Sequence, residues 1–419
     1  MIEIKKNAKI IFLQILVFIT LFMNYKIVVE QFGYLGFTNT FYTLEKSLIG
    51  ILITLTMIVF TMLINNSMYN LIYNICLPLF LYGQIIFYIY NNSTISLVLY
   101  MTIPCLGIIL LDKIDTKKKP LKRTAKIELN NRYNYMIILI LTVILIIPFF
   151  RNINNLNINN LFLQDIYETR LGENSLGFIS GYIFSPLARI ILPYLLVFSI
   201  DNKRRTLFWF SSISILLIFL LNGAVKSILF GFLSCLFFLK GNHYKKTFRF
   251  LIALFSIMSM SVAIYYTLAI DIIADYIRRI FFLPAYLFQL FFTTFSNNFT
   301  HYSHTSVAKL FKVNNFEGSL TRMVGENILK NENTNANVGI FTEGYISFGV
   351  IGVIFISMLF LLLIYILKKQ NIKPVYFGII FSYLYIVNTS FIETLLVTHG
   401  FLFLLIFSHY FIPQNQEQL

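Results

Sequence analysis

The sequence is poor in charged residues. Asp, Glu, Lys and Arg make up 12% of the 419 residues, whereas hydrophobic residues make up 58%. A water-soluble fold cannot cover that much apolar surface with so little charge. The composition therefore excludes a soluble protein and predicts an integral membrane protein.

Cysteine is also scarce, and several chemical motifs are missing. The three cysteines, Cys76, Cys105 and Cys235, all lie in apolar runs, which indicates neither a disulfide framework nor a metal cluster. The sequence has no Gly-rich phosphate loop, no Cys or His pair at metal spacing, no external Asp-x-Asp and no cytoplasmic nucleotide-binding domain. We therefore expect no metal ion and no cofactor. If the protein is a transferase, its donor must be lipid-linked and its energy must come from the leaving group.

Long apolar runs take up most of the chain. At about 17 to 22 residues each, they are long enough to cross a bilayer core of about 30 Å as helices. Barrel-type alternation is absent, so we predict an all-α, polytopic membrane bundle. The twelve runs are 10–29, 47–65, 70–90, 94–112, 134–150, 178–200, 206–221, 224–240, 249–270, 347–367, 374–391 and 396–412.

The basic residues predict the orientation of this single transmembrane domain. Most of the 33 Lys and Arg residues lie in one set of alternate connections, which marks the cytoplasmic side. Both termini are then cytoplasmic, and a smaller loop (151–178) and a large loop (271–346) are external. The N-terminal stretch has a basic start but no small-residue cleavage site, which favours a retained first helix. Topology thus accounts for most of the net charge of +15 without nucleic acid.

The basic residues outside the cytoplasmic connections are candidates for contact with a substrate. A guanidinium group binds phosphate through two parallel hydrogen bonds, so external arginines suit a diphosphate-linked lipid. The alternative is ordinary solvation and anchoring at the interface. Lys226, in a membrane hairpin, is either a snorkelling residue or a contact for an anionic headgroup. The arginines concerned are Arg170, Arg189, Arg278, Arg279 and Arg322.

The segment YIRRIFFLPAYLFQLFF opens the large loop and is too aromatic for a free loop. Its central proline and its two arginines predict an interfacial or re-entrant helix rather than another span. It either packs against the bundle or lines a groove for a lipid tail, with Arg278 and Arg279 at the level of the headgroup.

Two residues of the large loop are candidates for the catalytic base. A neutral imidazole is suited to removing a proton from a hydroxyl, which favours His304. The alternative role for His304 is a simple polar contact. Glu343 is the competing carboxylate, and it could instead bind sugar hydroxyls or pair with an arginine.

Taken together, these features resemble the bacterial oligosaccharide repeat-unit polymerases, the Wzy-type O-antigen or capsule polymerases. In and just after the smaller loop, Arg170 is followed by ten residues and then Gly181, and a Lys-Ser pair lies further on at Lys226 and Ser227. The large loop has Arg279 before an aromatic Pro-Ala stretch, then the string SHT, then NANVGIFTEGYISFG. The family's second Arg-to-Gly spacing does not follow Arg278 or Arg322.

The resemblance implies a metal-independent, GT-C-type glycosyltransferase in the bacterial inner membrane, with its active site facing the periplasm. It would transfer a growing glycan from undecaprenyl diphosphate to a new lipid-linked repeat unit. His304 and Glu343 would be catalytic, and Lys226 and the arginines other than Arg322 would bind the diphosphate. The resemblance also places four residues at the sugars: Arg322, Asn335, Asn337 and Tyr345.

Two other functions compete with this one. An O-antigen ligase uses a similar donor but transfers it to lipid A-core; the NANVGIFTEGYISFG string favours the polymerase. A flippase for lipid-linked oligosaccharides would carry charges inside its spans, whereas these runs are nearly free of charge. The expected partners are lipid-linked glycans, membrane lipid, and a chain-length regulator and flippase of the same pathway.

Overall fold

A computed structural model of the chain describes residues 2–115, 136, 140–144, 153–155, 184–221, 226–268, 272–312, 319–327 and 335–415. Every regular element in these residues is a helix, apart from an isolated bridge between Ile372 and Gln414. The all-α prediction is thus confirmed. The chain divides into a first unit (Met1–Lys118, Asn242–Tyr365 and Val387–Ile392) and a second unit (Lys119–Gly241, Ile366–Ile386 and Glu393–Leu419).

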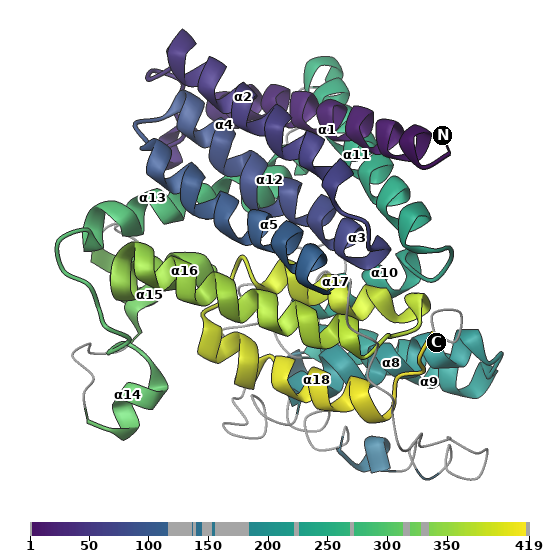
Figure 1. The fold of residues 1–419 in the computed structure, drawn as a ribbon. Coiled ribbons are helices and arrows are strands. Elements are labelled where there is room, and N and C mark those ends of the chain that lie inside the picture. Colours follow the sequence, from purple (N-terminus) through teal and green to yellow (C-terminus); the bar gives the residue numbers. More distant parts are fainter. Residues whose placement is uncertain are drawn as a thin grey trace. The chain divides into compact units, whose positions relative to one another are not determined.

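The first unit contains the longer helices (Figure 1). They are α1 (Ile2–Phe32), η1 (Gly33–Leu35), α2 (Leu44–Val59), η2 (Phe60–Leu63), α3 (Ser67–Cys76), η3 (Leu77–Tyr82), α4 (Gly83–Tyr90), α5 (Ile95–Asp115), α11 (His243–Leu268), α12 (Ile272–Ile277), η8 (Arg278–Phe282), α13 (Leu283–Phe295), α14 (Ser306–Leu310), α15 (Leu320–Asn327) and α16 (Ile340–Lys369), whose last turn passes into the second unit.

The second unit contains shorter helices. They are η4 (Ile153–Asn155), η7 (Leu187–Ile191), α8 (Leu192–Asp201), α9 (Arg205–Leu221), α10 (Lys226–Phe237), η9 (Pro374–Tyr376), α17 (Phe377–Ile386), η10 (Thr394–Thr398) and α18 (Phe401–Tyr410).

Among the residues that the structure describes, six helices are long and apolar enough to cross a membrane, which supports the prediction of a membrane protein. They are Asn7–Leu35, Leu44–Leu63, Ser67–Tyr90, Ile95–Asp115, His243–Leu268 and Ile340–Lys369. Four further apolar helices of the described residues are shorter: Arg205–Leu220, Ser227–Phe237, Pro374–Ile386 and Phe401–Tyr410. The predicted count of twelve spans is therefore not established, and the predicted run 134–150 lies mostly outside the described residues.

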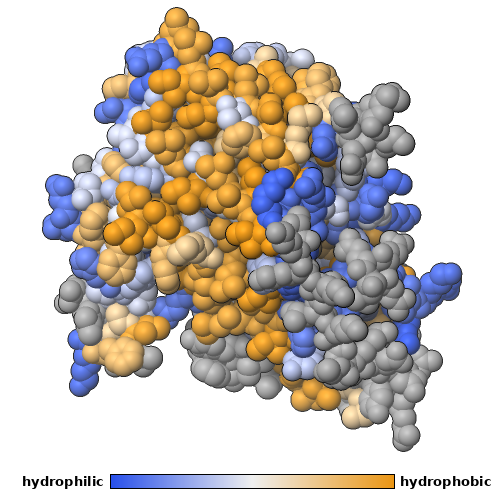
Figure 2. Space-filling model, viewed as in Figure 1, coloured by the Kyte–Doolittle hydropathy of each residue, from blue (hydrophilic) through white to orange (hydrophobic). Residues whose placement is uncertain are grey.

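The surface of α2 is largely apolar. Most of its exposed side chains are apolar, and Leu44, Leu48 and Leu52, four residues apart, are each at least 60% exposed. Apolar residues also cover much of the face that carries α2, α4 and α5 (Figure 2). Such a surface is typical of a helix in contact with lipid, and it is unfavourable in water.

The interior of the first unit joins its helices through side-chain amides. Gln14 of α1 donates to the Asn74 side chain of α3 at 2.9 Å, and Tyr82 donates to Gln14 Oε1 at 2.7 Å. All three residues are buried. In an apolar bundle these hydrogen bonds fix which helix faces meet, because an amide without a partner would be costly.

The aromatic segment of the large loop forms an unbroken helical path through α12, η8 and α13. Its middle part, η8, is π-helical, and Pro284 follows in the first turn of α13. A Cβ atom added at Gly83 would lie 1.9 Å from the carbonyl oxygen of Phe281, so the backbones of α4 and η8 are in direct contact. The segment thus packs closely on the bundle, as one of the two alternatives from the sequence predicted.

α16 is a helix with a sharp reversal near its start. Phe348 and Gly349 leave helical geometry, and Gly349 has φ +59°. A Cβ atom at Gly352 would lie 1.8 Å from the carbonyl oxygen of Gly344. Residues eight apart in a continuous helix are about 12 Å apart along the axis. The part before the break therefore folds back against the part after it.

The Gly83 contact predicts a specific loss of stability. Gly→Ala inside a helix normally stabilises a protein by about 0.5–1 kcal/mol, but Gly83→Ala forces a methyl group against the Phe281 backbone. We expect the free energy of unfolding in mixed micelles to fall by about 2 kcal/mol or more. Gly33→Ala, with open space around its Cβ position, is the control. Equal stability of Gly83→Ala and wild type would contradict the contact.

Candidate functional site

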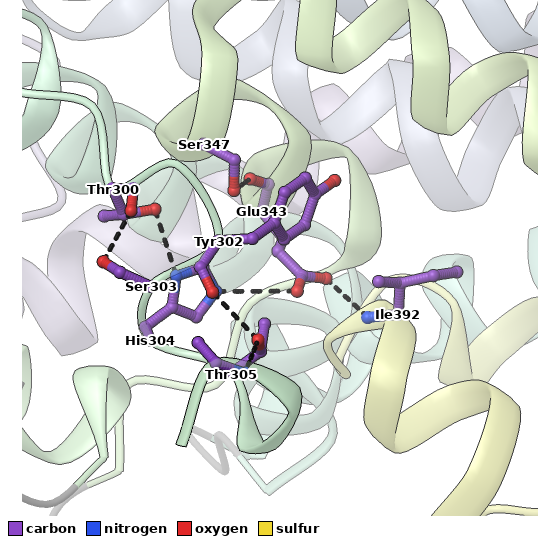
Figure 3. Close-up of polar contacts among 9 residues, drawn as sticks. Thr300, Tyr302, Ser303, His304, Thr305, Glu343, Ser347 and Ile392 are labelled. Carbon is purple, nitrogen blue, oxygen red and sulfur yellow. Dashed lines mark hydrogen bonds and ion pairs between the residues drawn. The ribbon is translucent and has the colours of Figure 1, made fainter. Parts of the chain in front are cut away.

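His304 and Glu343, which the sequence offered as competing bases, form a pair in the first unit (Figure 3). His304 Nε2 lies 3.5 Å from Glu343 Oε1. The two side chains are 1% and 0% exposed. Carboxylates this deep in a protein are rare without a partner, and here the imidazole provides one.

The break in α16 explains how the histidine comes to this place. A helix that stops at Ser347 leaves carbonyl groups without helical donors. Ile346 O accepts a hydrogen bond from Thr300 N–H at 2.8 Å, and Ser347 O accepts one from His301 N–H at 3.2 Å. The turn that carries His304 is therefore attached directly to the end of the helix that carries Glu343.

The turn itself has an uncommon backbone. His301 and Tyr302 both have positive φ, 48° and 59°, which is unfavourable for residues other than glycine. Ser303 N–H donates to Thr300 O at 2.9 Å and closes the turn, and Thr305 then caps α14. Two consecutive left-handed residues indicate that the surrounding contacts hold this turn in place.

Hydrogen bonds and aromatic rings fix the imidazole of His304. Its Nδ1 lies 3.0 Å from the hydroxyl of Thr300. The ring of Phe391 approaches it edge-on at 5.1 Å between centroids, and the ring of Tyr302 lies nearly parallel to it at 6.1 Å. Burial raises the pKa of the Tyr302 phenol, and the charge of Glu343 raises this pKa further, so the phenol stays neutral.

Glu343 is fixed from the opposite side by residues that precede η10. Its Oε2 accepts a hydrogen bond from the backbone N–H of Ile392 (Figure 3). The same segment accepts a hydrogen bond at Val387 O from Ile340 N–H, and a Cβ atom at Gly339 would lie 2.8 Å from Asn388 Cα. The start of α16 thus packs directly against the backbone of residues 387–392.

Glu343, His304 and Thr300 thus form a chain of contacts in which the imidazole lies between the carboxylate and the hydroxyl. When Nε2 carries the ring proton it donates toward Glu343, and Nδ1 then accepts from the Thr300 hydroxyl. A hydroxyl at the position of Thr300 Oγ1 can give its proton to Nδ1, and the carboxylate stabilises the imidazolium that forms. Such an arrangement can activate an alcohol as a nucleophile.

Arg278 and Arg279 share one carboxylate in the first unit. Arg278 Nη2 and Arg279 Nε lie 2.5 Å and 2.8 Å from the two oxygens of Asp275. Arg278 is also buried, with its guanidinium 4.6 Å from the ring centre of Phe32. The Arg279 side chain is 37% exposed, so of these two arginines it is the more accessible to an anion.

Four other predicted residues of the first unit lie outside this pair and turn. Arg322 is exposed and pairs with Glu326 at 2.5 Å, and Asn335 and Asn337 are exposed. Tyr345 is buried among aromatic rings, with the centroid of Phe292 at 4.8 Å. The structure therefore does not bring the proposed sugar-binding residues together around His304 and Glu343.

In the second unit, Arg189 lies among hydroxyl groups. It donates to Ser185, its neighbour one turn earlier, and to Ser227 at 3.1 Å. Ser227 is the serine of the Lys-Ser pair. The side chain of Lys226, and Arg170 altogether, lie outside the described residues. Among the residues that are described, no three His, Cys, Asp or Glu side chains are grouped as a metal site would need.

Sequence reasoning missed three contributors to the pair: Thr300, the Ile392 amide and the break at Gly349. A threonine four residues before His304 gives a weak signal, since any turn brings such residues together. The Ile392 amide leaves no signal in the sequence, because it contributes through its backbone. Gly349 was visible as part of the family-like string, but not as a reversal.

The link between the break and the turn can be tested by amide exchange. Gly349→Ala places a Cβ at positive φ and 2.9 Å from the ring of Phe299. We expect amide exchange in a peptide covering residues 299–305 to accelerate by about 10-fold or more, because a loss of about 1.4 kcal/mol gives that factor. Gly231→Ala, whose Cβ has room, is the control. Unchanged protection would show that the break does not hold the turn.

Three comparisons with known proteins provide no further guide to the site. The chain matches no protein-family model, no curated protein and no solved structure.

Proposed function

We propose that this protein polymerises lipid-linked oligosaccharide repeat units, transferring a growing glycan from undecaprenyl diphosphate to the sugar of a new lipid-linked unit. The observation that carries the proposal is the buried His304–Glu343 pair at the start of α16. Both residues belong to the stretch that resembles repeat-unit polymerases. A membrane protein with a hydroxyl-activating pair suits an acceptor alcohol attached to a lipid.

In the proposed step, an acceptor hydroxyl of the new unit takes the place of the Thr300 hydroxyl beside His304. Its oxygen attacks the anomeric carbon of the donor and forms the new C–O bond. The bond between that carbon and the diphosphate oxygen breaks, and undecaprenyl diphosphate leaves with the electron pair. The hydroxyl proton passes to His304 Nδ1, and Glu343 stabilises the imidazolium. Attack from the face opposite the leaving group inverts the anomeric centre.

The leaving diphosphate needs positive charge. Arg279 is the first candidate, because its side chain is exposed by 37% and carries several donors besides the Nε that faces Asp275. Arg278, buried against Phe32, acts in this proposal by positioning Asp275. Arg170, Arg189 and Lys226, the other cations that the sequence offered for this role, belong to the second unit, and the proposal does not depend on them.

The acceptor has to reach a buried imidazole, so the turn at residues 300–305 has to move. Its two left-handed residues make the closed form costly by about 1–3 kcal/mol each unless neighbouring contacts compensate. Opening the turn breaks the hydrogen bonds from Thr300 N–H and His301 N–H to the carbonyl groups of Ile346 and Ser347. We infer that the described arrangement is the closed form of the site.

The experiment that tests the proposal is elongation of a defined undecaprenyl-diphosphate repeat unit by the purified protein. His304→Gln and Glu343→Gln should each lower the rate by about 10²–10⁴-fold, the usual contribution of a general base. His409→Gln and Glu45→Gln, which alter a histidine and a glutamate outside the site, are the matched controls. Elongation at the wild-type rate by His304→Gln would remove the imidazole from the mechanism.

The same assay separates the polymerase from its nearest rival. With lipid A-core added as a second acceptor, a polymerase still extends the lipid-linked unit. Transfer to lipid A-core alone, without extension, would establish a ligase and overturn the proposal.

The proposed binding of the diphosphate by Arg279 predicts a loss of elongation rate that is separate from the effect of His304 and Glu343. Arg279→Gln should lower the elongation rate by about 10²–10³-fold, because the charge that develops on the leaving group loses a donor. Arg205→Gln, which changes an exposed arginine at the start of α9, is the control. Release of undecaprenyl diphosphate should fall in parallel with the glycan product. A normal rate in Arg279→Gln would assign this role to another cation.

A further inference from the structure

The connection between α1 and α2, residues 33–43, exposes aromatic side chains. Tyr34 is 81% exposed, and Phe41 and Tyr42 are 45% and 47% exposed. The connection carries no Asp, Glu, Lys or Arg. An exposed surface that is aromatic and uncharged marks contact with another protein or with a membrane.

The connection is held in place from its inner side. Phe37, at its centre, is 2% exposed and packs against the rings of Phe87 and Tyr286, whose centroids lie 6.4 Å and 5.5 Å from its own. The hydroxyl of Tyr25 donates to Thr38 O at 3.0 Å. The backbone of the connection is thus fixed on the first unit, and its outer aromatic side chains stay exposed.

Two observations favour a lipid bilayer as the partner. The helices on either side, Asn7–Leu35 and Leu44–Leu63, are each long and apolar enough to span a membrane, so their connection is expected where the chain leaves the bilayer. Exposed apolar side chains also continue along α2 through Leu44, Leu48 and Leu52. Lipid accounts for both surfaces with one partner.

The composition of the connection indicates the depth at which it lies. Beside the aromatic side chains it exposes uncharged polar ones, from Asn39, Thr40 and Thr43. Tyrosine rings are enriched where the hydrocarbon meets the headgroups, because one end of the side chain is apolar and the other is hydrated. Amide and hydroxyl groups are unfavourable in the hydrocarbon itself. The boundary between hydrocarbon and headgroups suits both kinds of side chain.

The same part of the first unit contacts Arg278. The guanidinium carbon lies 4.6 Å from the ring centre of Phe32, the last residue of α1, and 6.0 Å from that of Phe37. Arg278 and Arg279 in turn share the carboxylate of Asp275. The depth of the connection in a membrane therefore fixes the depth of both arginines.

We infer that residues 33–43 lie in the interfacial region of a lipid bilayer, with Tyr34 and Tyr42 among the headgroups. They thereby hold Arg278 and Arg279 at the depth of the lipid phosphate groups. The position in the membrane is independent of the proposed function. Only the use of Arg279 rests on that function, because the diphosphate of a lipid-linked donor lies at the same depth.

Tryptophan fluorescence measures the depth of the connection. Trp209 is the single tryptophan of the sequence, so a Trp209→Phe background lets one introduced tryptophan report alone. In phosphatidylcholine vesicles, lipids brominated near the headgroup or near the end of the acyl chain quench tryptophans at those depths, and iodide quenches those in water. We expect Tyr34→Trp to be quenched most by the shallow bromines, at a depth of about 5–10 Å. Leu52→Trp, about 12 Å beyond Leu44 along α2, is the control and should be quenched most by the deep bromines.

Three other results would each overturn the inference. Quenching of Tyr34→Trp by iodide alone places the connection in water. Protection from iodide and from both brominated lipids shows that protein covers it, for example a second copy of this chain. Strongest quenching by the deep bromines places it in the hydrocarbon. None of these results bears on elongation, so the proposed function is tested separately.

The depth of the arginines has its own test. Carbon–phosphorus solid-state NMR on protein with labelled guanidinium carbons, in phosphatidylglycerol vesicles, detects the arginines that lie beside lipid phosphate. We expect Arg279→Lys to lose the contribution of one arginine from the phosphate-contacting signal, because lysine keeps the charge but has no guanidinium carbon. The same phosphate-contacting signal in Arg279→Lys and wild type would show that Arg279 does not lie at this depth.

Discussion

The reversal of α16 at Phe348 and Gly349 is the constraint on which the first unit's candidate site depends. It ends a helix early and leaves the carbonyl groups of Ile346 and Ser347 free for the turn that carries His304. It also directs the start of α16 along residues 387–392, whose backbone holds Glu343. One glycine with positive φ thereby brings together three segments that are distant in the sequence.

The contacts around this reversal show how a hydrophobic protein builds a polar site. Glu343, His304 and Thr300 are all buried, and the polar contacts described above come from the turn, the helix end and the short segment before η10. Apolar rings of Phe391 and Tyr302 exclude water from the imidazole. A low-dielectric surrounding strengthens the carboxylate–imidazole interaction, and it makes any missing partner costly.

The sequence predicted much of the architecture, since apolar runs report helices directly. The all-α class and the apolar helices follow from composition and run length, and His304 and Glu343 stood out as titratable residues in a loop that the sequence predicts to be external. Their pairing could not be predicted, because a reversal at Gly349 and a backbone amide from Ile392 create it. The count of twelve spans depended on short runs, several of which form helices shorter than a membrane is thick.

The same reversal also shortens the part of α16 that can cross a bilayer. The apolar stretch from Ile340 to Lys369 has 30 residues and, as one straight helix, would be about 45 Å long, well beyond the hydrocarbon thickness of about 30 Å. Such an excess is hydrophobic mismatch, which a helix normally relieves by tilting or by deforming the bilayer. Folding back at Gly349 leaves about 20 residues to cross, which matches the bilayer without tilt. Residues 340–348, which the reversal removes from the span, include Glu343.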